Sequence, residues 1–239
     1  MSGKGGVGKT TIAVNLACSL SRKGFKVGLL DVDIHGPNAP NMLDISDEKP
    51  LSKDGKMLPI DYDKNLKVIS MAFLLDKKDA VIWRGPMKHN LIKQFIEDVA
   101  WGSLDYLVVD FPPGTGDEHI SMSQLLEGIT GCIIVSTPQK VALADAVRSI
   151  DFSRKVNIPI IGLVENMAGD IFGRGNVEKK AKENSVDFLG SLDMERSVME
   201  SGDKGEPFVT KDSESSMSFE LITDAVMSFC GSGDDKDAL

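Results

Sequence analysis

The sequence predicts an α/β fold with a doubly wound, mainly parallel sheet and helices on both faces. Two observations lead to this fold class: short apolar runs alternate with helical stretches along the chain, and a glycine-rich loop opens the first of those stretches. This alternation is typical of parallel strands that helices cover on both sides. The predicted strands fall at residues 26–32, 66–71, 106–111, 131–137, 158–165 and 186–190.

The first helix is predicted over residues 11–23, because Ile12, Leu16 and Leu20 recur at helical spacing and Gly24 follows as a stop signal. Prolines and a glycine within residues 44–65 indicate a surface excursion with a small hairpin. A length of 239 residues suits one domain over residues 1–230, followed by a disordered acidic tail at 231–239. Further helices are predicted at residues 87–100, 121–126, 142–155, 177–184, 194–201 and 216–229.

Composition narrows the classes of partner and the compartment. The formal net charge of −9 argues against unspecific nucleic-acid binding, which depends on clustered Lys and Arg. No apolar run approaches the roughly 20 residues of a membrane span, and no signal peptide is recognised, so we expect a cytoplasmic protein without a membrane partner. Cys18, Cys132 and Cys230 are too few and too widely spaced for a disulfide framework or a Cys-x-x-Cys metal site.

The glycine-rich loop satisfies the phosphate-loop pattern GxxxxGK[ST]. Its glycines allow consecutive backbone N–H groups to wrap a β-phosphate, while Lys9 bonds the β- and γ-phosphates and the Thr10 hydroxyl binds Mg²⁺. The N-terminus of the helix that follows directs its positive dipole end at the phosphates. The predicted nucleotide-binding loop residues are Gly3, Lys4, Gly5, Gly6, Val7, Gly8, Lys9, Thr10 and Thr11.

A strand should hold the start of this loop, yet only Met1 and Ser2 precede Gly3. A buried parallel strand needs roughly five apolar residues. We therefore expect that the first strand of the sheet is missing from this chain. The alternative, a fold that dispenses with the strand, would leave a row of ladder hydrogen bonds unmade in the middle of the sheet.

Three carboxylates follow predicted strands. Asp31 and Asp33 close the strand after the first helix, and Asp110 closes the strand at 106–111. Carboxylates at these positions can orient an attacking water or support Mg²⁺, and Asp110 has the position expected of a second Mg²⁺-shell carboxylate. Two prolines and two glycines then predict a switch segment that is stiff at its start and free at its end, with Pro113, Gly114, Gly116 and Asp117 as its marked residues.

Lys4 is an additional lysine at the start of the loop. It cannot easily fold back onto its own phosphates, but it could reach a nucleotide on a facing subunit and stabilise transition-state charge there. This hypothesis predicts a homodimer with the nucleotides between the subunits. The alternative is a solvated surface lysine.

Together these residues resemble the deviant phosphate-loop ATPases, which include MinD, ParA and the nitrogenase iron protein. More narrowly, six ordered blocks are similar to the Mrp/NBP35/ApbC branch, whose members are ATPases that carry iron–sulfur clusters to apoproteins. The blocks cover residues 31–38, 83–87, 110–117, 137–142, 165–167 and 202–207. The resemblance implies ATP and Mg²⁺ as cofactors, a homodimer in which Lys4 crosses over, and apoprotein clients or assembly proteins as partners. It also implies catalytic roles for Lys4, Lys9 and Asp33, of which Asp33 positions the hydrolytic water, and an adenine contact for Asn166. The metal site that it implies has Thr10 as a Mg²⁺ ligand, with Asp31 and Asp110 in support.

The sequence departs from the pattern of this branch at one place, which concerns the iron–sulfur cluster that the members carry. Typical members continue from the Glu-Asn-Met block into a Cys-x-x-Cys pair, whereas this chain runs Ala168-Gly169-Asp170-Ile171-Phe172 and has no cysteine there. Cluster ligation by that segment is excluded, and Cys230 alone would supply only two thiolates per dimer against the four usual for a [4Fe–4S] cluster. The sequence thus predicts an ATP-hydrolysing member of the cluster-carrier family without its own cluster ligands. The alternatives are a MinD- or ParA-like positioning switch and a nucleotide-dependent scaffold that does not hydrolyse ATP.

Overall fold

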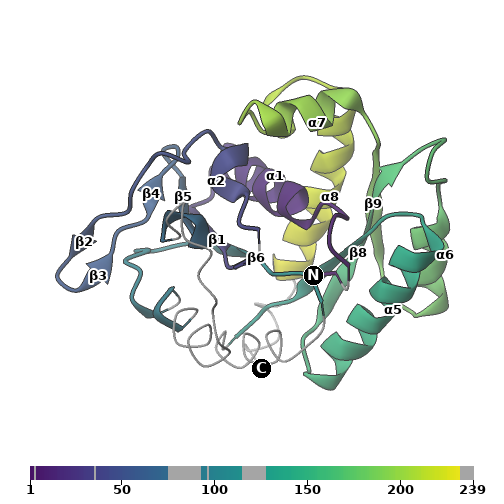
Figure 1. Cartoon of the computed structure of the whole chain (residues 1–239). Coiled ribbons are helices and arrows are strands. Elements are labelled where there is room, and N and C mark those ends of the chain that lie inside the picture. The colour runs from purple at the N-terminus through teal and green to yellow at the C-terminus, as the bar shows by residue number, and fades with distance from the viewer. Residues whose placement is uncertain (3, 35, 75–92, 96, 115–127, 232–239) are drawn as a thin grey trace.

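Parallel strands form the centre of the molecule (Figure 1). A computed structural model describes residues 1–2, 4–34, 36–74, 93–95, 97–114 and 128–231. The residues outside these ranges include Gly3, Gly116, Asp117, the block at 83–87, the helix predicted at 121–126, half of the helix predicted at 87–100 and nearly all of the tail.

In the described part of the chain, the parallel strands are arranged in two sheets. In the first, β1 (Val27–Asp31) pairs in parallel with β5 (Leu66–Ser70) on one side and β6 (Tyr106–Asp110) on the other, and β4 (Ile60–Asp61) adds an antiparallel edge to β5. In the second, β8 (Ile160–Ala168) lies between β7 (Cys132–Ser136) and β9 (Phe188–Asp193), all parallel. Within the described residues β6 and β7 do not pair with each other, so the mainly parallel sheet that was predicted is divided at this point.

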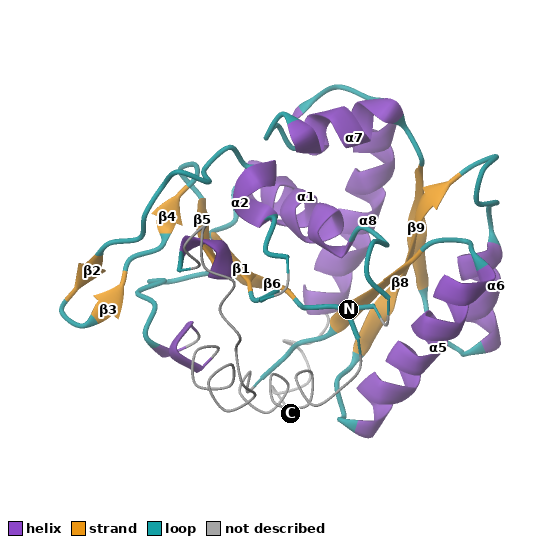
Figure 2. Cartoon of the chain, in the orientation of Figure 1, coloured by secondary structure: helices purple, strands orange, loops and turns teal. Residues whose placement is uncertain are grey.

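Helices cover both faces, as a doubly wound fold requires (Figure 2). The core on one face joins α1 (Lys9–Arg22) and α8 (Glu214–Gly231) to side chains of both sheets, such as Leu29 and Val135. The core on the opposite face of the second sheet joins α5 (Lys140–Lys155) and α6 (Asn176–Glu183) to Ile134. Neighbouring residues of β7 therefore enter opposite cores, which explains why its sequence is continuously apolar.

Shorter elements complete the fold. The predicted hairpin is present as β2 (Ser52–Lys53) and β3 (Lys56–Met57). The sequence pattern missed α2 (Ala39–Met42), a single turn in which Pro40 provides a favourable fixed φ near the helix start. The 3₁₀ turns η1 (Met71–Phe73) and η2 (Phe208–Thr210) follow β5 and α7 (Arg196–Asp203). No helix in the described residues is long and apolar enough to cross a membrane.

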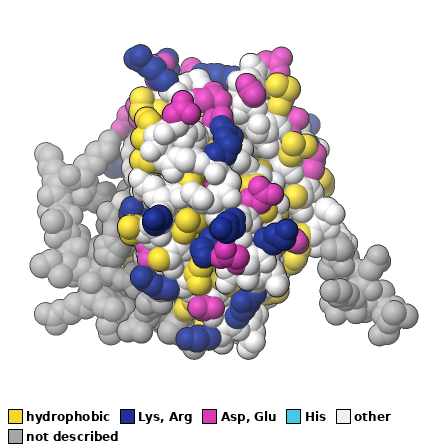
Figure 3. Space-filling view, turned by 90° about the vertical axis from the view of Figure 1, so that its right-hand side faces the viewer, with side chains coloured by type: hydrophobic (Ala, Val, Ile, Leu, Met, Phe, Trp, Pro, Cys, Tyr) yellow, Lys and Arg dark blue, Asp and Glu magenta, His cyan; other side chains and the backbone are white. Residues whose placement is uncertain are grey.

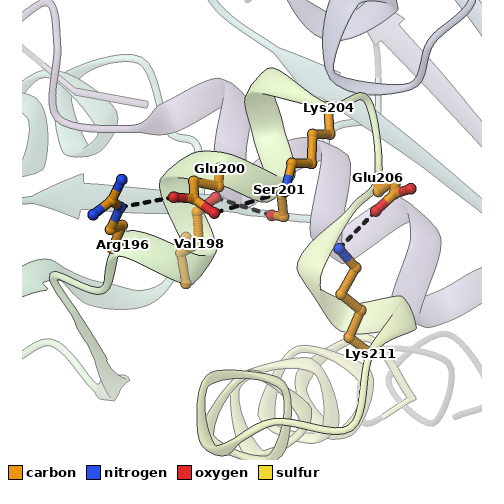
Figure 4. Close-up of polar contacts among 7 residues, drawn as sticks. All are labelled: Arg196, Val198, Glu200, Ser201, Lys204, Glu206 and Lys211. Atoms are coloured by element: carbon orange, nitrogen blue, oxygen red, sulfur yellow. Dashed lines mark hydrogen bonds and ion pairs between the residues drawn. The ribbon is translucent and has the colours of Figure 1, made fainter.

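Helix α7 and the turn after it carry a set of surface ion pairs (Figure 4). Arg196 contacts Glu200 at 2.7 Å, Lys204 contacts the same carboxylate at 3.6 Å, and Lys211 contacts Glu206 at 2.7 Å. Such exposed pairs contribute little to stability. The backbone between them is more constrained, because Gly205 has a φ of +69° and a Cβ built there would lie 2.6 Å from Cβ of Asp44.

Gly205→Ala is expected to destabilise the fold by about 2 kcal/mol or more, because the substitution adds both left-handed strain and a clash with the Asp44 backbone. Gly202→Ala is the matched control: it lies inside α7, and its added methyl would meet only the end of the flexible Met42 side chain at 3.4 Å. The control should be neutral or slightly stabilising, since alanine favours helix. Urea unfolding of both variants measures the difference in stability. Equal midpoints would contradict the strain and the clash that we infer at Gly205.

Candidate nucleotide-binding site

The phosphate loop and the start of α1 have the backbone geometry that phosphate binding needs. Gly6 and Gly8 have left-handed φ values of 80° and 87°, and Gly8 is the residue at which α1 is capped. The helix begins at Lys9, with the Ile12 N–H donating to the Gly8 carbonyl at 3.1 Å. The unpaired N–H groups of its first turn and its positive dipole end therefore lie directly behind the loop.

Asn166 fixes the loop from the end of the second sheet. Its side-chain amide is buried and donates to the Val7 carbonyl at 2.9 Å, and a Cβ on Gly8 would lie 2.2 Å from Nδ2 of Asn166. Only glycine fits at position 8, both for its φ and for this contact. The observed partner of Asn166 is thus the loop itself, and its contact with adenine remains a prediction.

Lys9, Thr10 and Asp110 gather at the mouth of the loop. The Thr10 hydroxyl donates to Oδ2 of Asp110 at 2.6 Å. Burial lowers the pKa of Lys9, and the charges of Asp110 and Asp33 oppose that shift. Burial likewise raises the pKa of Asp110, opposed by the Thr10 hydrogen bond and by Lys9. A hydroxyl and a carboxylate are the oxygen donors that Mg²⁺ takes in nucleotide sites, so this set fits the predicted ion.

Asp31 is held inside the protein by hydrogen bonds. Its two oxygens accept from the Ser70 hydroxyl at 2.9 Å, the Asp33 N–H at 3.1 Å and the Ala39 N–H at 3.3 Å. Burial, with Asp110 alongside, raises the pKa of Asp31 to about 7. These contacts anchor the segment after β1, so its support of the metal stays a prediction and an indirect one. Sequence reasoning missed Ser70, although a polar residue at the end of the apolar strand β5 was a usable signal.

Asp33 is half-buried, and the Gly36 N–H donates to its Oδ1 at 3.3 Å. It acts electrostatically on Lys9 and Asp110, so the predicted water-orienting carboxylate lies at the same edge of the sheet as the loop. Open parallel sheets bind ligands at this edge, beyond the carboxyl ends of their strands.

The start of the predicted switch segment lies against the loop. A Cβ built on Gly5 would be 4.0 Å from that of Pro113, and the Gly114 N–H donates to the Ser2 carbonyl at 3.1 Å. The movement of this segment with nucleotide state stays a prediction. Lys4 is half-buried with its carbonyl bound to the Ser2 hydroxyl at 2.8 Å, and in the described part of the chain its side chain forms no ion pair.

The segment that lacks the expected cysteines forms a short closed turn. Gly169 and Gly173 exchange backbone hydrogen bonds of 2.9 and 2.8 Å. The buried Glu165 carboxylate then accepts from the N–H groups of Gly175 and Val177, which fixes the start of α6. Cys18 and Cys132 are buried and Cys230 is half-buried. Among the described residues, no three His, Cys, Asp or Glu side chains lie close enough to hold a metal ion.

Comparison with known proteins gives the family. The family model described as ParA, NUBPL iron-transfer P-loop NTPase, matches residues 1–227. The chain belongs to this family. Its resemblance to the iron–sulfur carrier branch of the deviant phosphate-loop ATPases is thereby confirmed.

Curated relatives of the family cover most of the chain. An iron-sulfur cluster carrier protein of Methanocaldococcus jannaschii is 46% identical over 238 residues, covering 95% of this chain and 82% of its own. A cytosolic Fe-S cluster assembly factor NUBP2 homolog of Trichoplax adhaerens is 46% identical over 230 residues, covering 90% of this chain and 87% of its own. The cytosolic Fe-S cluster assembly factor CFD1 of Eremothecium gossypii is 46% identical, and the match covers 84% of this chain and 78% of its own.

Solved structures of similar proteins contain nucleotides. A nucleotide-binding protein of Archaeoglobus fulgidus in complex with ADP aligns with a TM-score of 0.77 at 32% identity, over 88% of this chain and 86% of its own. MinD of Pyrococcus horikoshii with Mg-ADP aligns with a TM-score of 0.76 at 23% identity, over 95% of this chain and 93% of its own. This likeness supports the fold alone. The family fold thus agrees with the α/β prediction.

Proposed function

We propose that this protein is a Mg²⁺-dependent ATPase that acts in iron–sulfur cluster assembly or transfer to apoproteins, and that it works as a homodimer in the cytoplasm. The observation that carries the proposal is the contact of Thr10 with Asp110 beside Lys9, at the mouth of a left-handed glycine loop. Relatives named as cluster carriers and cytosolic assembly factors, at 46% identity, support the pathway and the compartment.

In this proposal, different residues serve nucleotide binding and nucleotide hydrolysis. The loop backbone and Lys9 bind the phosphates, and Thr10 and Asp110 would hold Mg²⁺, which neutralises charge on the phosphate oxygens when bound. Asp33 follows the end of β1 and would accept a proton or orient water at the same edge of the sheet. Asp31 keeps the segment that carries Asp33 in place, because its carboxylate accepts a hydrogen bond from the Asp33 N–H at 3.1 Å.

Hydrolysis is tested by phosphate release. Asp33→Ala is expected to retain nucleotide binding and lose at least about 100-fold in hydrolysis, since general-base or water-orienting groups contribute that much. Lys26→Ala, which alters a distant position before β1, serves as the control. Equal rates for wild type and Asp33→Ala would instead favour the scaffold that binds ATP without turnover.

The iron–sulfur role needs a separate test, because this chain lacks the cysteine pair. We propose that any bridging cluster is held by thiolates of another protein, and that this chain handles the cluster as cargo. After anaerobic reconstitution with iron and sulfide, the protein alone should bind no stoichiometric cluster. With ATP it should accelerate transfer of a cluster to an apo-enzyme. The donor in this assay is a cluster-loaded related protein that has the Cys-x-x-Cys pair. An unchanged transfer rate would remove the iron–sulfur role and leave the ATPase standing.

The positioning-switch alternative has less support. A MinD-like switch needs a basic amphipathic C-terminal helix, whereas α8 has no basic residue in its last turn. Figure 3 shows one face of the molecule, on which Lys and Arg are interspersed with Asp and Glu rather than gathered into a basic patch. Such a distribution gives a weak site for the nucleic-acid backbone.

A further inference from the structure

Strand β8 contains one extra residue close to its carboxyl end. Glu165 pairs with Ser191 of β9. The next pair joins Ala168 to Asp193, so β8 advances by three residues where β9 advances by two. This mismatch is a β-bulge, a feature that bends the strand and gives a side chain a new direction. Met167 lies inside the bulge, at the edge where open parallel sheets bind ligands.

The backbone of Met167 is strained. Its φ of +59° lies in the left-handed region, which residues with a Cβ occupy only at a cost. Hydrogen bonds just beyond the bulge hold this conformation. The Met194 N–H donates to the Ala168 carbonyl at 2.8 Å, and Gly169 and Gly173 are bonded to each other. Strain that the surrounding structure maintains in this way is concentrated at ligand sites.

The side chain of Met167 reaches the same place as that of its neighbour Asn166. In a regular strand, successive side chains point to opposite faces of the sheet. Here a Cβ built on Gly8 would lie 2.2 Å from Nδ2 of Asn166 and 3.8 Å from Cε of Met167. Asn166 is buried and holds the Val7 carbonyl, whereas Met167 is half-buried. An apolar side-chain end thus lies beside a polar amide at the residue that caps α1.

The left-handed φ would not by itself call for methionine. Glycine adopts this conformation without steric cost, so the backbone alone favours glycine at position 167. Methionine at this position therefore places a side chain where the backbone favours none. Its thioether is polarisable and makes favourable contacts with aromatic rings.

We propose that the Met167 side chain is an apolar wall for the purine ring of the bound nucleotide, and that the bulge turns the side chain toward that ring. The proposal rests on the proposed function and on the adenine contact predicted for Asn166. Small-molecule sites combine apolar walls with a few polar groups that fix the orientation of the ligand. Asn166 would then bond the edge of the base, while Met167 packs against the ring.

Thermal unfolding without nucleotide tests the strain. Met167→Ala and Met167→Gly both remove the side chain, but only glycine relieves the left-handed φ, so its Tm should be about 3 °C higher. The matched control is Ser185, which is exposed, has a φ of +53° and lies before the start of β9. Ser185→Gly should gain as much over Ser185→Ala. Equal Tm values for the two Met167 variants would overturn the strain on which the proposal depends.

Calorimetric titration with ATP and with inorganic tripolyphosphate, both with Mg²⁺, tests the wall, because tripolyphosphate has no base. Met167→Ala and Met167→Gly should bind ATP about tenfold more weakly than wild type and tripolyphosphate equally well. Met167→Leu keeps an apolar side chain and should stay within about threefold of wild type for ATP. Both Ser185 variants should bind ATP as wild type does.

The other outcomes separate this inference from the proposed function. Unchanged ATP affinity in Met167→Ala would overturn the wall. An equal loss for ATP and tripolyphosphate would also overturn it, because the side chain would then support the phosphate loop rather than the base. A wild-type protein that binds neither ligand would overturn the proposed function, and the wall with it.

Discussion

Lys9→Ala is expected to weaken nucleotide binding by at least about 100-fold, because charge-assisted hydrogen bonds are worth about 1.5 to 3 kcal/mol each and this lysine bonds two phosphates. The lysine is already partly desolvated beside Asp110 and Asp33, so its charge acts in a medium that screens it weakly. Its removal also leaves two carboxylates at the site without their cation. Titration with a fluorescent ATP analogue measures the loss.

Lys23→Ala is the matched control for this variant. Lys23 lies at the opposite end of the same helix, where it contacts Asp224 at 2.9 Å on the surface. Its removal should leave affinity unchanged and cost little stability. Thermal unfolding of both variants without nucleotide separates a binding defect from a folding defect. A folded Lys9→Ala protein that binds ATP as tightly as wild type would contradict the assignment of the loop.

Local signals were sufficient for the elements that form the site. The alternation of apolar runs predicted β1, β5, β6 and β7 to within about a residue at each end. The glycine pattern predicted the loop and the start of α1, because the positive φ values at Gly6 and Gly8 are a local requirement that few other residues meet. The end of α1 was equally clear, since Gly24 adopts a φ of +94° there.

Contacts between distant segments were beyond the reach of pattern alone. The resemblance implied an adenine contact for Asn166, whereas the structure pairs its side chain with Val7, and only tertiary packing brings those residues together. Asp31 was chosen as a metal support, and its bonds to Ser70 and Ala39 depend on the register of β1 with β5 and on a turn that no periodicity revealed. Pattern thus placed these residues at strand ends, while packing set their immediate partners, and their roles at the nucleotide stay predictions.

Lys4→Ala is expected to retain ATP binding and to lose the hydrolysis that depends on dimer formation, by about 1,000-fold if Lys4 acts as an arginine finger does. In the described residues the Lys4 side chain has no ion pair to hold it, and its backbone is fixed by the Ser2 hydroxyl, so the side chain is free to cross an interface. Hydrolysis per subunit in the wild type should rise with protein concentration, and the variant should stay low at every concentration.

Mixing two inactive variants decides whether Lys4 acts on its own site or on the facing one. In a mixed dimer of Lys4→Ala with Asp33→Ala, the subunit that keeps Asp33 faces a subunit that keeps Lys4, so one complete site forms only if the lysine crosses over. Because half of randomly paired dimers are mixed and each has one complete site, the mixture should recover about a quarter of wild-type activity. If Lys4 serves its own subunit, no dimer contains a complete site and the mixture stays inactive.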